Sequence, residues 1–98
     1  MDITEKYISR GKDVKFRELD SQCVLLNLET GAYYTLNRVG AFIWDLLDGN
    51  RRVHEIIDRV VDRFRVARGV AADDVKALLE DLEGEGLIEI TEIPAKQR

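Results

Sequence analysis

The first third of the chain alternates apolar and polar residues with the period of two that is typical of β-strands. From Asp13 the pattern has this period: Val14 and Phe16 share one side with Glu18, and Lys15 and Arg17 lie opposite. A second apolar run covers residues 23–28. A Glu-Thr-Gly turn follows it, in which the glycine can adopt a positive φ, and residues 33–36 then run back. The pattern therefore predicts three short antiparallel strands in this part of the chain.

Beyond residue 36 the apolar residues recur at the spacing of an α-helix. The first helix is predicted to begin after Asn37, a good N-cap, and to stop at Gly49. Gly40 lies inside this helix, where glycine is unfavourable, which indicates that a neighbouring element approaches closely there. The second helix is predicted from an apolar stripe made of Val53, Ile56, Ile57, Val60, Val61 and Phe64.

A third helix is predicted to start near Ala71, with two aspartates favourably placed at its positive N-terminal end. Its apolar stripe consists of Val75, Leu78, Leu79 and Leu82, and Gly84 or Gly86 ends it. Residues 87–90 can add a further short strand. Because each helix has one apolar stripe, all three are expected to pack over one face of the sheet. The predicted fold is α+β and winged-helix-like, with a three-stranded antiparallel sheet followed by three helices.

The predicted domain covers residues 12–90. Residues 1–11 contain few apolar anchors and are expected to form a loosely ordered N-terminal arm, and residues 91–98 a polar C-terminal tail. A domain of this size, with 45% apolar residues in a chain of 98, can close one modest core but leaves little room for a deep enclosed pocket.

The charge and cysteine content narrow the class of protein further. Acidic residues outnumber lysines and arginines by 19 to 15, and a moderately acidic chain is poorly suited to phosphate backbones or anionic lipids. Apolar runs are too short to span a membrane, and charged residues interrupt the first ten positions, so no signal-peptide core is expected. The single cysteine fits a reducing compartment. We expect a cytoplasmic protein without membrane contact.

Few side chains in the sequence are suited to catalysis. His54, the only histidine, is predicted in the first turn of the second helix, where a solvated side chain is favoured over a general base. Cys23 lies in an apolar strand, which favours a small buried residue over a reactive thiol. One histidine and one cysteine do not make a structural zinc site. We expect no catalytic residues, no metal and no cofactor.

A winged-helix-like fold raises the alternative of a transcriptional regulator or another DNA-binding domain. In such domains the last helix of the three enters the major groove. Here residues 71–92 contain eight acidic residues against Lys76 alone, which is the wrong sign for contact with phosphates. The second helix is richer in arginine. A solvated, salt-bridged face is favoured there, and partner docking through Arg59 and Arg63 is the other interpretation.

The sequence also resembles a known family, the PqqD family, over roughly residues 12–90. The run 24–31 reads Val-Leu-Leu-Asn-Leu-Glu-Thr-Gly. The resemblance continues through Tyr33-Tyr34, Leu36-Asn37, Gly40, Ile43-Trp44, Leu46-Leu47 and Gly49. Glu55-Ile56 and the closing Leu82, Gly86, Leu87 and Ile88 are similar to the second helix and C-terminal end of the family.

This resemblance implies a function. PqqD-like proteins are non-catalytic recognition domains for ribosomally made precursor peptides that are modified after translation. They bind the leader part of the precursor as an added strand between the third strand and the third helix. They present it to a modifying enzyme, often a radical S-adenosylmethionine (SAM) enzyme, as in the biosynthesis of pyrroloquinoline quinone (PQQ). The implied partners are therefore a leader peptide and such an enzyme, and the chain is expected to be a monomer or a weak homodimer.

The expected peptide site combines the third strand with one flank of the third helix. On the strand it comprises Tyr33, Tyr34, Thr35 and Leu36, with Tyr34 and Leu36 facing the helices because side chains alternate along a strand. On the helix it comprises Ala72, Val75, Lys76, Leu79 and Glu83. Because the third helix is acidic, we expect the peptide to carry basic residues where it meets that helix.

Overall fold

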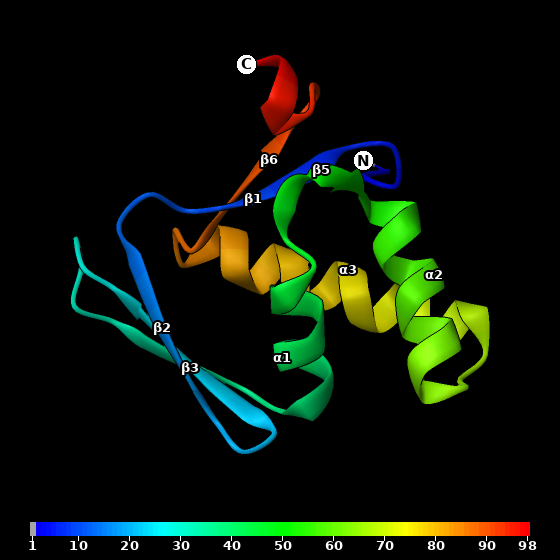
Figure 1. The fold of residues 1–98 in the computed structure, drawn as a ribbon, viewed down its shortest axis with the longest axis horizontal. Helices are drawn as coiled ribbons and strands as arrows, with labels where there is room; N and C mark the ends of the chain where they lie inside the picture. Colours follow the sequence, from blue (N-terminus) through cyan, green and yellow to red (C-terminus); the bar gives the residue numbers. More distant parts are fainter. Residues whose placement is uncertain (1) are drawn as a thin grey trace.

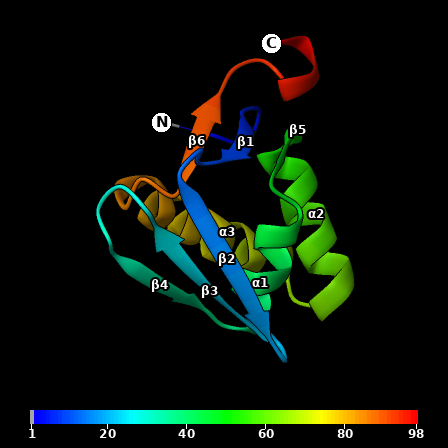
Figure 2. The same cartoon turned by 60° about the vertical axis from the view of Figure 1, so that its left-hand side comes forward.

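Three strands form the sheet that the sequence pattern predicts at the front of the chain. The computed structural model describes residues 2–98. In it β2 (Val14–Leu19), β3 (Gln22–Asn27) and β4 (Tyr33–Leu36) are antiparallel and lie in the order β2-β3-β4 (Figure 2). The Glu-Thr-Gly turn joins β3 to β4, and Gly31 has a φ of 78° as expected for a tight hairpin connection.

Three helices accompany this sheet, which confirms the predicted fold class. They are α1 (Arg38–Asp45), α2 (Val53–Phe64) and α3 (Arg68–Gly84) (Figure 1). Because α2 packs mainly against α3 and lies farther from the sheet, the expectation that all three helices cover the sheet is wrong for α2. The core lies between the helices and the sheet, where it buries the inward-facing strand residues Cys23, Leu25 and Leu36. Trp44 of α1 is also almost fully buried. Among residues 2–98 no helix combines the length and the apolar character that a membrane crossing requires.

The junction between β4 and α1 is held by local contacts that the sequence signals correctly. The Asn37 side-chain oxygen accepts a hydrogen bond from the Gly40 backbone N–H at 2.9 Å, so Asn37 is the predicted N-cap. A Cβ atom at Gly40 would lie only 3.1 Å from Leu36 Cδ2 and 3.2 Å from Leu36 Cβ. The close approach predicted at Gly40 is therefore that of β4 itself, which fixes the end of this strand against α1.

The third helix starts earlier than predicted, at Arg68 rather than near Ala71. Arg65 ends α2 in the left-handed conformation, with a φ of 54°, and its backbone N–H is bonded to the Val61 carbonyl oxygen. This tight C-cap reverses the chain, so that only residues 65–67 separate the two helices. An ion pair links Arg68, the first residue of α3, to Asp58 in the middle of α2. As a consequence the two aspartates lie in the second turn of α3 and not at its N-terminus.

A second three-stranded sheet is the main feature that the sequence analysis missed. It consists of β1 (Tyr7–Arg10), β5 (Asp48–Arg52) and β6 (Ile88–Thr91), in the order β5-β1-β6. The loosely ordered arm predicted for residues 1–11 is therefore wrong for residues 7–10, because β1 is the central strand and Ile8 is fully buried. The strand predicted at 87–90 is confirmed as β6, and Gly49 lies in β5 rather than at the end of α1.

The C-terminal residues pack against this second sheet. A short 3₁₀ helix, η1 (Ala95–Gln97), follows Pro94, which is buried. The Lys96 backbone N–H donates to the Asn50 side-chain oxygen at 3.0 Å. The predicted polar tail is thus attached to β5 by a specific hydrogen bond.

Candidate functional site

The outer strand β4 has one unpaired edge, because within residues 2–98 it pairs only with β3. The Asn27 N–H donates to the Ala32 carbonyl oxygen at 2.9 Å, and antiparallel ladders alternate between bonded and non-bonded residue pairs. With the observed register, Tyr34 and Leu36 therefore direct their backbone groups toward β3. Tyr33 and Thr35 direct theirs to the free edge. Two residues thus offer an N–H and a C=O each to an incoming strand.

The side chains of β4 alternate as predicted. Leu36 is 2% exposed and forms part of the core, and the Tyr34 hydroxyl reaches α3. On the other face of the sheet Thr35 is exposed, and Tyr33 is 71% exposed, the most of any large apolar side chain in the described chain. Tyr33 and Thr35 therefore contribute their backbone to the free edge, while Tyr34 and Leu36 contribute their side chains to the space beside α3.

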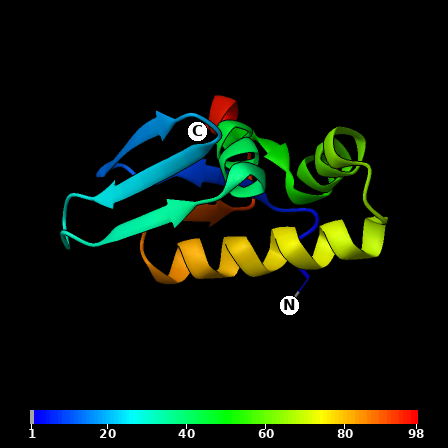
Figure 3. The same ribbon diagram turned by 90° about the horizontal axis from the view of Figure 1, so that it is seen from below.

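A groove of about 450 Å³ lies between β4 and α3, which run side by side in Figure 3. Its floor is apolar and includes Leu36, Gly40 and Ile43, all of which are buried. Its α3 wall is formed by residues three or four positions apart on one flank of the helix: Asp74, Ala77, Leu78 and Asp81. The remaining lining residues are Tyr34, Thr35, Asn37 and Val39.

The α3 residues predicted for the site do not line this groove. Val75 and Leu79 are fully buried in the core, and Ala72 is half-buried. Lys76 lies 3.8 Å from the Asp2 carboxylate, and Glu83 lines a hollow with Ile3 and Lys6, which is bounded by the N-terminal residues and β6. The apolar stripe shows which face of a helix is buried, but it does not show which of the two flanks lies beside β4. Of the predicted residues, Lys76 and Glu83 therefore lie on the flank of α3 that is turned away from this groove.

Among the described residues that line the groove, two are acidic and none is basic. The Tyr34 hydroxyl donates to Asp81 Oδ2 at 3.4 Å, which is long for a hydrogen bond. Burial of the Tyr34 phenol, together with the nearby Asp81 carboxylate, raises the pKa of Tyr34. The phenol therefore stays protonated at neutral pH and remains a donor. Asp81 keeps most of its capacity to accept hydrogen bonds from a ligand.

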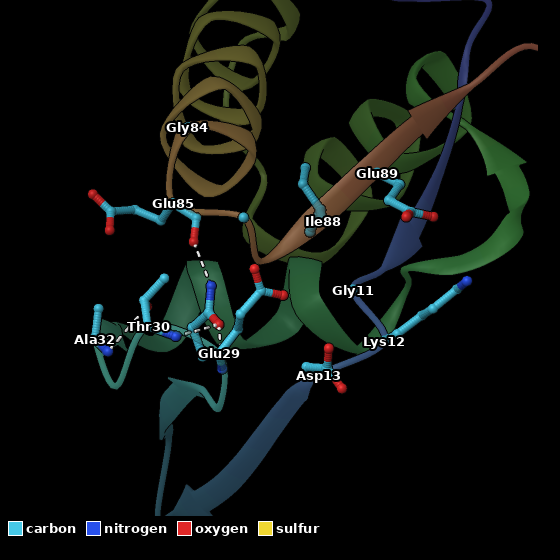
Figure 4. Close-up of a pocket in the computed structure, with 12 residues that line it drawn as sticks. Gly11, Lys12, Asp13, Glu29, Thr30, Ala32, Gly84, Glu85, Ile88 and Glu89 are labelled. Atoms are coloured by element: carbon cyan, nitrogen blue, oxygen red, sulfur yellow. Dashed lines mark hydrogen bonds between the residues drawn. The ribbon is translucent and has the colours of Figure 1, made fainter.

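A second hollow, of about 580 Å³, lies where the β3–β4 turn meets the end of α3 (Figure 4). Its central residue is Asn27, which is 6% exposed and was not singled out by the sequence analysis. Asn27 Nδ2 donates to the Glu85 carbonyl oxygen at 2.9 Å, and Asn27 Oδ1 accepts from the Glu29 N–H at 2.9 Å. The Asn27 side chain thus fixes the end of β3 and the β3–β4 turn to the end of α3. An asparagine just before a Glu-Thr-Gly turn was the available signal.

The other residues considered in the sequence lie away from the groove. Cys23 is fully buried, and burial raises the pKa of its thiol, as expected for a structural cysteine. His54 is half-buried in the first turn of α2, with its ring 3.9 Å from Glu5. Arg59 and Arg63 are exposed on α2, where the Arg63 guanidinium stacks 5.1 Å from the centre of the Phe64 ring.

Comparisons with known proteins identify the family. The family model described as coenzyme PQQ synthesis protein D (PqqD) matches residues 22–88, which include β3, β4 and all three helices. No curated protein sequence matches significantly. Among solved structures, TbiB1 in complex with the TbiA(beta) leader peptide is 33% identical, with a TM-score of 0.77 over 83% of this chain and 94% of that chain.

A second solved structure, a lasso peptide synthetase B1 complexed with the leader peptide, has a TM-score of 0.74 over 84% of this chain and 96% of that chain. At 23% identity this likeness concerns the fold alone. The family model covers more than half of the sequence and contains both walls of the groove between β4 and α3. This chain belongs to the PqqD family.

Proposed function

We propose that this protein binds the leader part of a ribosomally made precursor peptide as an added strand on β4. The observation that carries the proposal is the unpaired edge of β4 beside a groove with an apolar floor. Membership of the PqqD family supports it, as does the 33% identical TbiB1, whose structure is a complex with a leader peptide. The peptide-binding residues of β4 are Tyr33, Tyr34, Thr35 and Leu36, and those of α3 are Asp74, Leu78 and Asp81.

The proposed binding mode follows from the physics of a sheet edge. An extended peptide satisfies the free N–H and C=O groups of Tyr33 and Thr35, which gives affinity that tolerates many sequences. Alternate peptide side chains enter the groove between β4 and α3, where they gain selectivity from its floor and charges. The Asn37 cap holds the end of β4 in place, and the Asn27 hydrogen bonds hold the turn that leads into β4. A preformed edge lowers the ordering cost of binding.

The protein is proposed to present the peptide and not to modify it. In the described part of the chain the groove lining contains two carboxylates and no histidine, cysteine or lysine, which supports binding rather than acid–base or nucleophilic catalysis. The chemistry then belongs to a partner, a radical SAM enzyme or another peptide-modifying enzyme. The acidic α3 wall supports this function over the alternative of a DNA-binding domain, because Asp74 and Asp81 would oppose phosphate contacts.

Amide chemical-shift mapping tests the binding site. The protein is titrated with the TbiA(beta) leader peptide and with the leader of the precursor peptide encoded nearest to its gene. We expect at least one of the two to shift the amides of residues 33–36 and 74–81, and to leave β5 and the far end of α2 unchanged. Shifts confined to the second sheet or to α2 would place the peptide elsewhere and refute the proposed site.

The α2 arginines are the proposed contact with the modifying enzyme. Arg59 and Arg63 are exposed, and neither forms an ion pair within residues 2–98. Changing both to glutamate is expected to weaken enzyme binding at least about fivefold, while leader affinity stays unchanged, because α2 does not border the groove. Surface plasmon resonance measures both affinities, the one for the leader peptide and the one for the enzyme encoded beside the precursor gene.

The matched control for this prediction is Lys15→Glu combined with Arg17→Glu. It changes the net charge by the same amount on the exposed strand β2, far along the chain from α2. Equal losses in the two double variants would show a general charge effect, and would return Arg59 and Arg63 to a solvated surface.

A further inference from the structure

Two carboxylates of the groove have acceptor capacity that the protein itself does not use. Asp74 and Asp81 lie on the flank of α3 that faces β4 and line the same groove. Within residues 2–98 neither forms an ion pair, and the only side-chain hydrogen bond of the two is the long one from Tyr34 to Asp81. Other acidic residues of α3, such as Glu80 and Glu83, line the hollow on the opposite flank. The negative charge of the groove is therefore located at two defined positions.

The spacing of these two positions can be compared with that of a bound strand. Asp74 and Asp81 are seven residues apart, which is about 10.5 Å along a helix axis that rises about 1.5 Å per residue. In a strand added to β4, the side chains that point into the groove are those opposite Tyr34 and Leu36, because cross-strand neighbours share a face. These two peptide residues are separated by one residue and lie about 6.7 Å apart. Each side chain then has to splay outward by roughly 2 Å to reach its carboxylate.

The walls of the groove favour long side chains with an apolar stem. Between the two carboxylates lie Ala77 and the half-buried Leu78, and the floor is formed by buried Leu36 and Ile43. Lysine and arginine can lay their methylene groups on such a surface while the charged end reaches a carboxylate at the rim. Acidic side chains at the same positions would meet like charge.

We infer that the leader segment recognised by this groove carries two basic residues, lysine or arginine, separated by a single residue, with one facing Asp74 and the other Asp81. The inference rests on the proposed function and specifies the peptide chemistry of that same site. The spacing holds for both directions of the added strand, because a strand alternates its side chains in either direction. The residue between the two basic ones points to the outer face of the sheet, beside Tyr33 and Thr35.

Two synthetic peptides of identical composition test the spacing. Both are capped at their ends and consist of threonine and valine with two lysines. In one the lysines are separated by one residue, and in the other by two, so that only the first peptide can place both lysines on one face. Dissociation constants are measured by amide-shift titration. The first peptide is expected to bind the protein about tenfold more tightly, and this ratio should shrink as salt rises from about 0.05 to 0.5 M.

Matched protein variants show whether the groove carboxylates cause the preference. Asp74→Asn combined with Asp81→Asn should reduce the ratio between the peptides to about one. The control, Asp73→Asn combined with Glu80→Gln, removes the same charge from exposed α3 positions outside the groove and should leave the ratio unchanged. The inference is overturned if both peptides bind equally, if neither binds, or if the control variant loses the preference as well.

The same titrations separate this inference from the proposed function. Equal binding of the two peptides, with shifts still centred on residues 33–36, would refute the charge pattern and leave strand addition standing. Shifts that avoid residues 33–36 altogether would instead refute strand addition on β4, and with it the inference.

Discussion

Replacing Thr35 by proline is expected to reduce leader binding at least about tenfold while the protein stays folded. Proline removes the Thr35 N–H, one of the two donors on the free edge of β4, and its ring occupies the space that the partner strand needs. A lost hydrogen bond is worth about 1 kcal/mol, and the steric conflict adds to this. Because Thr35 is a non-bonded partner of Val24, the ladder between β3 and β4 keeps its hydrogen bonds. Isothermal titration with a leader peptide measures the loss.

Two further variants make this result specific. Thr35→Val keeps the N–H and the β-branched shape, and should bind leader as the native protein does. Tyr34→Pro removes an N–H that points to β3 and should destabilise the domain, visible as a lower urea midpoint. A folded Thr35→Pro protein with native affinity would rule out strand addition at this edge.

Replacing Trp44 by alanine is expected to lower the free energy of unfolding by about 3–5 kcal/mol, a large part of the roughly 5–15 kcal/mol typical of a domain. Trp44 is 1% exposed in the core beneath the sheet. Its ring meets Phe16 edge to face at 5.7 Å, and its carbonyl oxygen accepts a hydrogen bond from Arg10 at 2.8 Å. The alanine variant loses the ring contacts and leaves a cavity. Urea unfolding followed by far-UV circular dichroism measures the change.

Trp44→Phe is the informative comparison. The Trp44 Nε1 atom is buried and has no hydrogen-bond partner within residues 2–98, so phenylalanine removes an unsatisfied donor while keeping an aromatic ring. We expect Trp44→Phe to lower the free energy of unfolding by less than half as much as Trp44→Ala. The reason is that the removal of the unpaired N–H offsets part of the stability lost with the smaller ring. Equal losses for the two variants would contradict this expectation, because they would show that neither the retained aromatic ring nor the relief of the unpaired N–H stabilises the domain.

Local patterns in the sequence were sufficient for most of the elements around the site. The period of two predicted β4 at its observed bounds, and the apolar stripe of Val53 to Phe64 matches α2 in the structure. These signals are short-range, since a strand and a helix each repeat their side-chain direction within a few residues. The cap at Asn37 and the tight contact at Gly40 were also predictable, because both depend on neighbours less than five positions away.

The features that the sequence analysis missed are those that depend on contacts between distant residues. The second sheet joins residues 7–10, 48–52 and 88–91, each of which is too short to show a clear pattern alone. The buried role of Asn27 likewise appears only where the β3–β4 turn meets Glu85, 58 positions further along the chain.

The sequence by itself determined that residues 33–36 form a strand and that the third helix is acidic, because strand period and charge can be read from consecutive residues. That this strand lies beside that helix was implied by the family resemblance. Only the tertiary structure decided which flank of that helix lies beside the strand. In the sequence the apolar stripe of α3 identifies the face that is buried in the core. The two flanks of this face cannot be told apart in the same way. The packing of α3 between the two sheets breaks this symmetry, and it places Asp74 and Asp81, rather than Lys76 and Glu83, along the free edge of β4.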